Sequence, residues 1–177
     1  MSAEDHMQPD RVRQALRHLV GPVSVVTTRD HDRPWGMTVS AFTVVCLEPP
    51  TMALCVNRAT ATADHIIQTG RLGLNVLSDD QVEMSQRCAA PGESKFLAAG
   101  DVANAGAIRT DGSAAAPLLA GALLAFDCDA ECLDVAGTHL LVAARVRSLV
   151  LGDQRQPLLY GAGEYHRPWP LASSPAG

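Results

Sequence analysis

The residues best suited to chemistry lie between Arg33 and Thr62, in the run RPWGMTVSAFTVVCLEPPTMALCVNRATAT. After Gly36 come small and hydroxyl-bearing side chains that leave the backbone reachable by a flat ligand; the residues concerned are Thr38, Val39, Ser40 and Ala41. Further along, a loop supplies hydroxyls, a guanidinium and the free N–H groups of a helix start, from Asn57, Arg58, Thr60 and Thr62. Such groups suit a phosphate. A planar ligand with a phosphate tail would therefore fit both halves of the run.

Two strands and a helix are expected to position these residues. The first strand, Gly36 to Leu47, ends at Glu48-Pro49-Pro50, because proline lacks the N–H that a ladder needs and restricts the residue before it. The second strand, Thr51 to Val56, leads into the loop. A short helix from Thr62 to Thr69 follows, and Gly70 is expected to close it.

The spacing of apolar residues predicts the other elements. A helix is expected from Pro9 to Val20, because Val12, Leu16 and Leu19 fall on one face of it. The remaining expected elements are a strand at 23–28, a turn at 29–34, a strand at 72–77, a helix capped by Ser78 with Gln81 at the capping-box position and running to about Ala89, a long excursion at 91–116, a hairpin of 118–135 and 139–151, and a last strand at 156–160. Strands outnumber helices. The pattern predicts a mainly β protein, an antiparallel barrel with peripheral helices.

Composition limits the classes of protein that fit. A chain of 177 residues with 47% hydrophobic residues is expected to form one domain with a packed core, spanning 9–167, with flexible termini at 1–8 and 168–177. The net charge of −5 argues against a nucleic-acid partner. No apolar run approaches the ~18 residues of a membrane-spanning helix, and no signal peptide is visible. We therefore expect a cytoplasmic protein that does not bind membranes.

The cysteines and histidines predict neither disulfides nor a metal site. The five cysteines are an odd number, no pair has C-x-x-C spacing, and the histidines form no H-E-x-x-H. Such spacings are what structural and catalytic zinc sites require. The chain also lacks G-x-G-x-x-G after a strand, G-x-x-x-x-G-K-[ST] and G-x-S-x-G. We expect reduced thiols, and the sequence offers no sharp pair of nucleophile and base.

Five segments resemble, in order, those of one known family. G-M-T-V-S-A-F-T-V-V-C-L-E-P-P from Gly36 is similar to a segment of the flavin reductases that form the small component of two-component monooxygenases. The resemblance continues at 57–62, at 74–81, at Gly137-Thr138-His139 where the family has G-D-H, and at 157–160 with Tyr165 after it. It covers roughly Val12 to Arg167. The chain is identified as a member of this family by the resemblance alone.

The resemblance implies a split β-barrel that forms a homodimer and binds FMN or FAD. It implies an enzyme that oxidises NADH or NADPH and gives reduced flavin to a separate monooxygenase. Such chemistry needs no triad, because the cofactor carries the hydride step. The family pattern places His139 near the nicotinamide and Arg87 within reach of the phosphate. The chain departs from the family pattern at two positions, with Thr138 in place of Asp and Cys88 in place of Phe. These departures weaken the roles that the resemblance implies for the neighbouring His139 and Arg87.

Each of these residues also has a simpler interpretation. Thr60 and Thr62 could be ordinary helix caps, Arg58 and Arg87 solvated charges, and His139 a structural residue. Tyr160 and Tyr165 could line the ring site or pack, and packing is favoured for Trp169. Three other functions stay open: a flavin-holding electron carrier or sensor without nicotinamide turnover, a relative of the pyridoxamine-phosphate oxidases, and a partner-binding dimer without cofactor.

Overall fold

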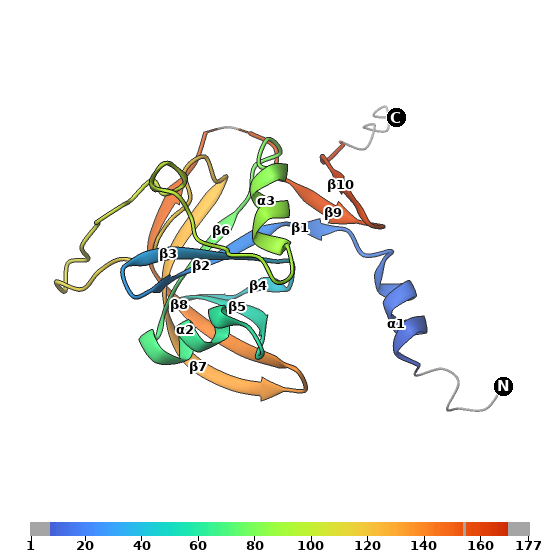
Figure 1. The fold of residues 1–177 in the computed structure, drawn as a ribbon, viewed down its shortest axis with the longest axis horizontal. Helices are drawn as coiled ribbons and strands as arrows, with labels where there is room; N and C mark the ends of the chain where they lie inside the picture. The colour runs from blue at the N-terminus through green and yellow to red at the C-terminus, as the bar shows by residue number, and fades with distance from the viewer. Residues whose placement is uncertain (1–7, 154, 170–177) are drawn as a thin grey trace, which may run out of the picture.

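The structure is a computed structural model that describes residues 8–153 and 155–169. Its elements are α1 (Pro9–Leu16), β1 (Gly21–Pro22), β2 (Ser24–Asp30), β3 (Arg33–Val39), β4 (Phe42–Leu47), β5 (Pro50–Asn57), α2 (Ala61–Thr69), β6 (Arg71–Val76), α3 (Val82–Ala89), a 3-10 turn η2 (Ala99–Asp101), β7 (Leu124–Ala136), β8 (His139–Leu151), β9 (Leu159–Gly161) and β10 (Glu164–His166). Most of the chain forms one β structure with helices at its periphery (Figure 1). The expected flexible termini lie mostly outside the described residues.

Seven strands form one antiparallel sheet in the order β3-β2-β6-β7-β8-β5-β4. The two edge strands, β3 and β4, are consecutive in the chain and are joined by Ser40 and Ala41 alone. The sheet therefore curves into a split barrel that opens between these edges, as the sequence predicted. The single strand expected from Gly36 to Leu47 is wrong, because the chain leaves one edge at Ser40 and enters the other at Phe42.

The barrel interior is filled from both halves of the chain, and α2 closes one side of it. Ala63 and Ile66 of α2 are fully buried in the same cluster as Val26, Leu54 and Leu74. The Oγ1 of Thr60 accepts a hydrogen bond from the N–H of Ala63 at 3.4 Å, so Thr60 is the N-cap. Gly70 closes the helix with a φ of 64°. The helix expected at 62–69 is confirmed.

A second apolar cluster lies between the barrel and α3, and it includes Val25, Leu77 and Cys88. The helix begins at Val82, four residues later than the cap expected at Ser78. The hydroxyl of Ser78 instead donates to the carbonyl oxygen of Gly121 at 2.8 Å. Gln81 keeps one half of the expected capping box, since its side-chain oxygen accepts from the N–H of Ser78 at 3.2 Å.

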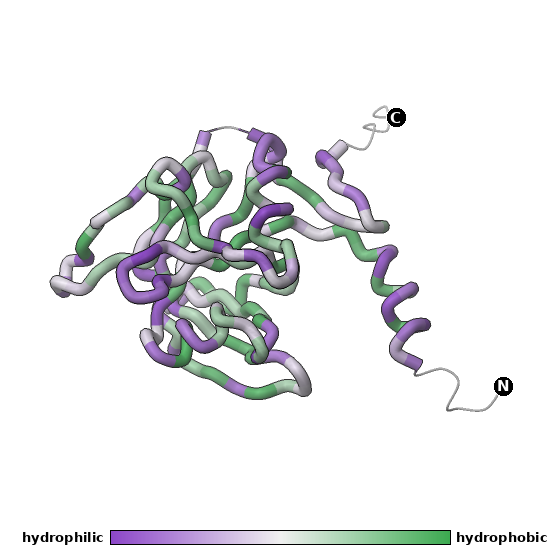
Figure 2. Tube along the Cα trace, viewed as in Figure 1, coloured by the Kyte–Doolittle hydropathy of each residue, from purple (hydrophilic) through white to green (hydrophobic). Residues whose placement is uncertain are grey.

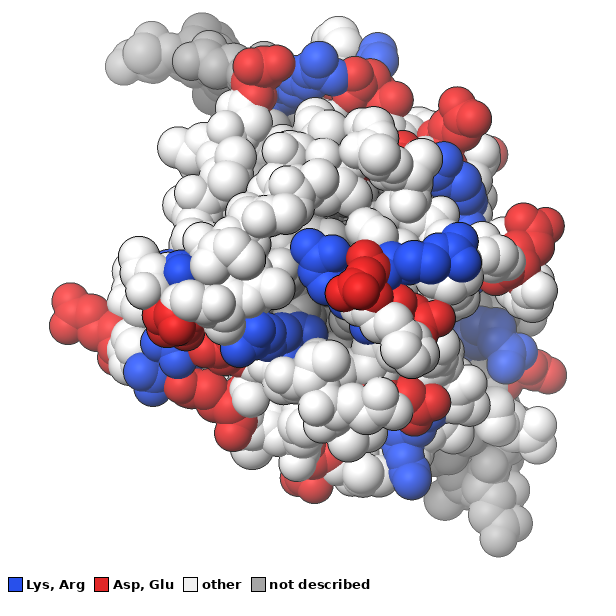
Figure 3. Space-filling view, turned by 60° about the vertical axis from the view of Figure 1, so that its left-hand side comes forward, with Lys and Arg blue, Asp and Glu red and all other residues white. Residues whose placement is uncertain are grey.

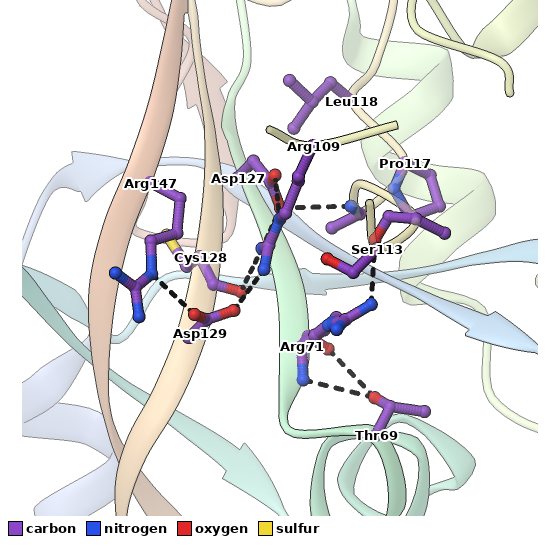
Figure 4. Close-up of polar contacts among 12 residues, drawn as sticks. Thr69, Arg71, Arg109, Ser113, Pro117, Leu118, Asp127, Cys128, Asp129 and Arg147 are labelled. Atoms are coloured by element: carbon purple, nitrogen blue, oxygen red, sulfur yellow. Dashed lines mark hydrogen bonds and ion pairs between the residues drawn. The ribbon is translucent and has the colours of Figure 1, made fainter. Parts of the chain in front are cut away.

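The long excursion expected at 91–116 is confirmed, and a buried ion pair attaches it to β7 (Figure 4). Both oxygens of Asp127 accept from the Arg109 guanidinium at 2.6 Å, and Asp127 Oδ1 also accepts from the N–H of Ala116 at 3.1 Å. The side chains of Arg109 and Asp127 are 8% and 1% exposed. Arg109 also pairs with Asp129, which in turn pairs with Arg147 at 2.6 Å. The excursion is therefore held against the barrel by charge-assisted hydrogen bonds.

The segment that follows the excursion, before β7 begins, also lies directly against the strands. Asn75 of β6 is fully buried, and its side-chain oxygen accepts from the N–H of Leu119 at 2.8 Å. At Gly73 a Cβ would collide with Thr27 Oγ1 and with the carbonyl oxygen of Pro117. Only glycine leaves room for this approach of backbone to sheet.

The predicted hairpin is confirmed, with β7 and β8 paired up to Ala136 and His139, but its first strand begins at Leu124 rather than at Leu118. The last strand is not the one expected, because β10 follows β9 and pairs with it, while β9 also pairs with β1. All five cysteines are free thiols, as predicted. No helix among the described residues is long and apolar enough to cross a membrane. Acidic and basic side chains are intermixed on the face shown in Figure 3.

Among the described residues, α1 and β4 expose apolar side chains to solvent. The helix α1 stands away from the barrel (Figure 1), ends at Leu16 rather than Val20, and has no buried residue. Figure 2 shows apolar and polar residues alternating along it. The edge strand β4 exposes Val44, Val45 and Leu47 to 58%, 57% and 78%. Apolar area of this kind on a helix and on an unpaired strand edge is typical of an interface.

Candidate functional site

A cavity of about 370 Å³ lies where β3 leaves the barrel. Three walls surround it: the end of β3, one face of α3, and the small sheet of β9 and β10. The residues that line it are Val23, Met37, Thr38, Val39, Ser40, Ser85, Cys88, Ala89, Lys95, Tyr160 and Tyr165. Thr38, Val39 and Ser40 thus line one cavity, and their contact with a flat ligand stays a prediction.

Hydrogen bonds hold the three walls together. The hydroxyl of Thr38 donates to the carbonyl oxygen of Ser85 at 2.7 Å, which joins β3 to α3. The hydroxyls of Ser85 and Tyr165 are 2.9 Å apart, which joins α3 to β10. The rings of Tyr160 and Tyr165 meet edge to face with centroids 5.2 Å apart. The three walls are therefore joined to one another, and the lining is a mixture of hydroxyls, apolar side chains and aromatic rings.

Charge in the cavity comes from Lys95, which is the sole formally charged residue among those that line it in the described part of the chain. The neighbouring thiol of Cys88 is uncharged at neutral pH. Burial raises the pKa of Cys88 to about 11, although Arg87 and Lys95 partly oppose the rise. Because only a thiolate is an effective nucleophile, the protonated thiol of Cys88 is not suited to covalent chemistry.

A second hollow of about 790 Å³ continues from the first. The two share Ser40 and Tyr160. Ala41 lines this second hollow together with Arg13 of α1, Arg17 directly after it, and residues of the hairpin of β9 and β10, including Gly161. The two hollows form one groove across the break between the barrel edges.

The loop from Asn57 to Thr60 lies at the same end of the sheet. The N–H of Cys55 donates to the carbonyl oxygen of Ala41 at 3.0 Å, so β5 runs past the break toward this loop. The side-chain oxygen of Asn57 accepts from the N–H of Ala59 at 2.9 Å, and its carbonyl accepts from the hydroxyl of Thr60 at 2.7 Å. Asn57 therefore shapes the turn. Arg58 is exposed, and its backbone N–H donates to the carbonyl oxygen of Thr138 at 3.0 Å.

Two of the predicted ligand residues are not at this site. Thr62 is fully buried, and its hydroxyl accepts from the indole N–H of Trp35 at 3.1 Å. Arg87 pairs with Asp101 at 2.7 Å in a separate hollow that also contains Asp80 and Glu83. The helical repeat explains the second result, because Ser85, Cys88 and Ala89 share the cavity face of α3 while Arg87 points elsewhere. The side chains of Thr62 and Arg87 therefore point neither into the cavity nor toward the loop.

His139 lies beside the loop rather than in the cavity. It is exposed, and it faces Asn57 in the register of β5 and β8. Its Nδ1 is 3.0 Å from the hydroxyl of Thr138, so the residue that replaces the family's aspartate still orients the imidazole. The imidazole is therefore held in place without a carboxylate partner of its own.

Ser85 and Lys95 are cavity residues that sequence reasoning did not identify. Both come from segments far from β3 in the chain, and neither carries a motif of its own. Tyr160 and Tyr165, for which two roles were open, line the cavity. Trp169 does not pack as favoured, since it is 89% exposed. To find Ser85 and Lys95 from the sequence, one would need to know which face α3 turns toward β3 and where the excursion runs.

Comparison with known proteins agrees with this architecture. Residues 16–168 match the model of the flavin reductase like domain. A flavin reductase of Pseudomonas putida is 31% identical over 90% of this chain and 89% of its own length. The reductase subunit HsaB of a flavin-dependent monooxygenase from Rhodococcus jostii is 29% identical over 92% of this chain and 80% of its own.

Solved structures give the same answer. BorF, the flavin reductase component of a bacterial two-component tryptophan halogenase, superposes with a TM-score of 0.78 at 27% identity, over 90% of this chain and 98% of its own. The styrene monooxygenase flavin reductase of Pseudomonas putida S12 has a TM-score of 0.75 at 27% identity, over 90% and 99% of the two chains. The split barrel, the groove at its open edge and these matches together show that the chain belongs to the flavin reductase family.

Proposed function

We propose that the protein is an NAD(P)H:flavin oxidoreductase that supplies reduced flavin to a partner monooxygenase. The observation that carries the proposal is the placement of a cavity and a cationic loop at one end of the split barrel. Relatives named as reductase subunits of flavin-dependent monooxygenases and as NADH-dependent FMN reductases support it. The bound flavin would supply the hydride-accepting chemistry.

The residues present fit a flavin. A cavity of about 370 Å³ has room for a tricyclic ring, and its entrance is formed by the exposed residues Ser40 and Ala41. The exposed Arg58, the cap Thr60 and the first turn of α2 would hold the phosphate, because helix starts and guanidinium groups favour anions. Asn57 would act through the turn that it shapes. Thr62 and Arg87 are left out of the proposed contacts.

The chain's own task is to position two rings and to exclude water. Thr38 and Val39 would present the β3 wall to the ring, and Ser85 and Tyr165 hold that wall in place through the bonds described above. Correct orientation of reactants is worth several kcal/mol of a barrier. No acid or base is required of the cavity residues, which agrees with its uncharged thiol and hydroxyl lining.

We also propose a homodimer in the cytoplasm. The apolar faces of α1 and β4 are unsatisfied in one chain, and the groove between them is open to solvent on one side. A second copy related by two-fold symmetry would cover both. Free thiols at all five cysteines fit a reducing compartment.

A second function, a carrier or sensor that keeps its flavin, uses the same site. An assay of NADH and NADPH oxidation with each of FMN, FAD and riboflavin distinguishes the reductase from the carrier. The same assay identifies the preferred flavin and nicotinamide. Fast nicotinamide oxidation on adding flavin to protein that retains little of it supports the reductase. Stoichiometric bound flavin with no nicotinamide oxidation would instead establish the carrier.

Replacing Arg58 by methionine is expected to weaken FMN but not riboflavin, which lacks the phosphate. A hydrogen bond to a charged group contributes roughly 1.5–3 kcal/mol, which corresponds to roughly a ten- to 150-fold loss of affinity. Fluorescence titration with both flavins measures it. Arg155→Met, at an exposed arginine paired with Asp80, is the matched control. Equal weakening of both flavins by Arg58→Met would show that Arg58 does not contact the phosphate.

Replacing His139 by alanine is expected to slow flavin reduction by NAD(P)H while flavin affinity stays nearly constant. Misplacement of one reactant by about 1 Å can cost on the order of a hundredfold in rate. Stopped-flow reduction under anaerobic conditions measures the rate, and equilibrium titration measures the affinity. Thr138→Val, which removes the hydroxyl beside Nδ1, should give a smaller effect of the same kind. Weaker flavin binding with a normal reduction rate would place His139 on the flavin side instead.

A further inference from the structure

Lys95 brings one positive charge to a cavity whose other lining residues are uncharged. The residue is half-buried, and its backbone belongs to the excursion rather than to any wall that the sequence motifs identify. Among the described residues, no carboxylate forms an ion pair with its ammonium group, while every arginine of the excursion and hairpin network has one. The charge is therefore available to a ligand.

The backbone on both sides of Lys95 is fixed to β3. Its carbonyl oxygen accepts from the N–H of Gly36 at 2.9 Å, and the N–H of Leu97 donates to the carbonyl oxygen of Pro34 at 2.9 Å. Between them, the ring of Phe96 meets Trp35 edge to face with centroids 5.0 Å apart. The segment 95–97 extends the edge of the barrel, which gives the lysine stem a defined starting point at the cavity wall.

The segment 95–97 and α3 pack closely against β3 at Gly36. At Gly36 a Cβ would lie 3.0 Å from the sulfur of Cys88 and 3.2 Å from a methyl group of Leu97. The thiol of Cys88 remains protonated at neutral pH because burial raises its pKa to about 11. It therefore does not neutralise the ammonium beside it.

We propose that Lys95 determines which redox form of flavin this site prefers, by stabilising the negative charge that the flavin ring gains on reduction. The inference rests on the proposed function. In that reaction the C4–H bond of the reduced nicotinamide breaks, its electron pair forms the N5–H bond of the flavin, and the nicotinamide leaves as NAD(P)⁺. One negative charge is left on the ring system. A cation at the wall of a half-buried cavity attracts that charge more strongly than the same cation would in bulk water.

The alternative use of Lys95, as a second phosphate ligand, fits the structure less well. The cavity floor is apolar, with Val23, Met37 and Val39, and the loop with Arg58 already offers a cationic site at an exposed helix start. An apolar floor suits a ring, and a phosphate there would lose its hydration without enough donors to replace it.

The test uses Lys95→Met, which removes the charge but keeps a stem of similar length, and Lys95→Arg, which keeps the charge. Anaerobic titration gives the dissociation constants for oxidised and for reduced flavin, and spectroelectrochemistry gives the midpoint potential of the bound flavin. We expect Lys95→Met to weaken reduced flavin about tenfold relative to oxidised flavin. For a two-electron couple this lowers the potential by about 30 mV. Lys95→Arg should stay close to the wild type in both measurements.

Arg87→Met is the matched control, because Arg87 lies on the other side of α3 and pairs with Asp101. It should leave the preference between the two forms unchanged. Normal flavin binding by the wild type with an unchanged preference in Lys95→Met would overturn the inference alone. Wild-type protein that binds neither form of flavin would overturn the proposed function as well.

Discussion

Arg109→Met is expected to be among the most destabilising single substitutions in the chain. It leaves the carboxylate of Asp127, 1% exposed, without the guanidinium that both of its oxygens contact. Removing one partner of a buried ion pair costs roughly 3–5 kcal/mol, because the other charge stays buried and unpaired. Urea unfolding followed by circular dichroism measures the free energy of unfolding.

The double variant Arg109→Met with Asp127→Leu shows whether the stability lost in Arg109→Met comes from the unpaired charge of Asp127 or from altered packing. It should recover most of the lost stability, since two apolar side chains leave no unpaired charge. Arg147→Met is the control within the same network, because Arg147 is 46% exposed where it pairs with Asp129 and should cost only about 1 kcal/mol or less. Equal losses from Arg109→Met and Arg147→Met would contradict the role assigned to the buried pair.

Val45→Asp is expected to break the homodimer proposed above into monomers and, with it, to abolish flavin binding. Val45 is 57% exposed on β4, so the substitution costs little within one chain. In an apolar interface the same carboxylate would be buried without a partner, at a cost of several kcal/mol per subunit. Obligate interfaces bury roughly 2,000 Å² or more and tolerate such a charge poorly.

Sedimentation velocity and flavin titration on the same sample check this result. Ile108→Asp is the matched control, since Ile108 is 65% exposed on the excursion rather than on β4 or α1. That variant should remain dimeric and bind flavin normally. A monomeric wild type with full flavin affinity, or a dimeric Val45→Asp, would contradict the proposed interface and the part of the site that it covers.

The features that could be predicted from sequence are those encoded within a few neighbouring residues. The cap at Thr60 and the closing glycine at Gly70 both depend on local hydrogen bonds and backbone freedom. The α2 helix and its loop are therefore found where they were expected. The same reasoning missed the break at Ser40 and Ala41, because the run from Met37 to Leu47 contains no proline or glycine to mark the point at which the chain changes from one edge of the barrel to the other.

The features that could not be predicted depend on contacts between distant segments. The local sequence predicts Ser78 as a helix cap, but its hydroxyl donates a hydrogen bond to the carbonyl oxygen of Gly121, which belongs to a distant segment. Arg87 matches a motif position, but the face that α3 presents to β3 is decided by the packing of Cys88 and its neighbours. Lys95 reaches the cavity only because segment 95–97 pairs with the edge of β3. Tertiary context, rather than local propensity, decides all three positions.

The environment of Trp35 gives the protein a built-in optical probe. The indole N–H donates to the buried hydroxyl of Thr62, and the ring touches Phe96 and His65 with centroids 5.0 and 6.0 Å away. It therefore connects the helix behind the cationic loop with the segment that carries Lys95. The chain has two tryptophans, and the other, Trp169, is 89% exposed. In a Trp169→Phe background, emission from Trp35 would come from a single rigid fluorophore between the two halves of the site, so that quenching on titration reports occupancy without any label.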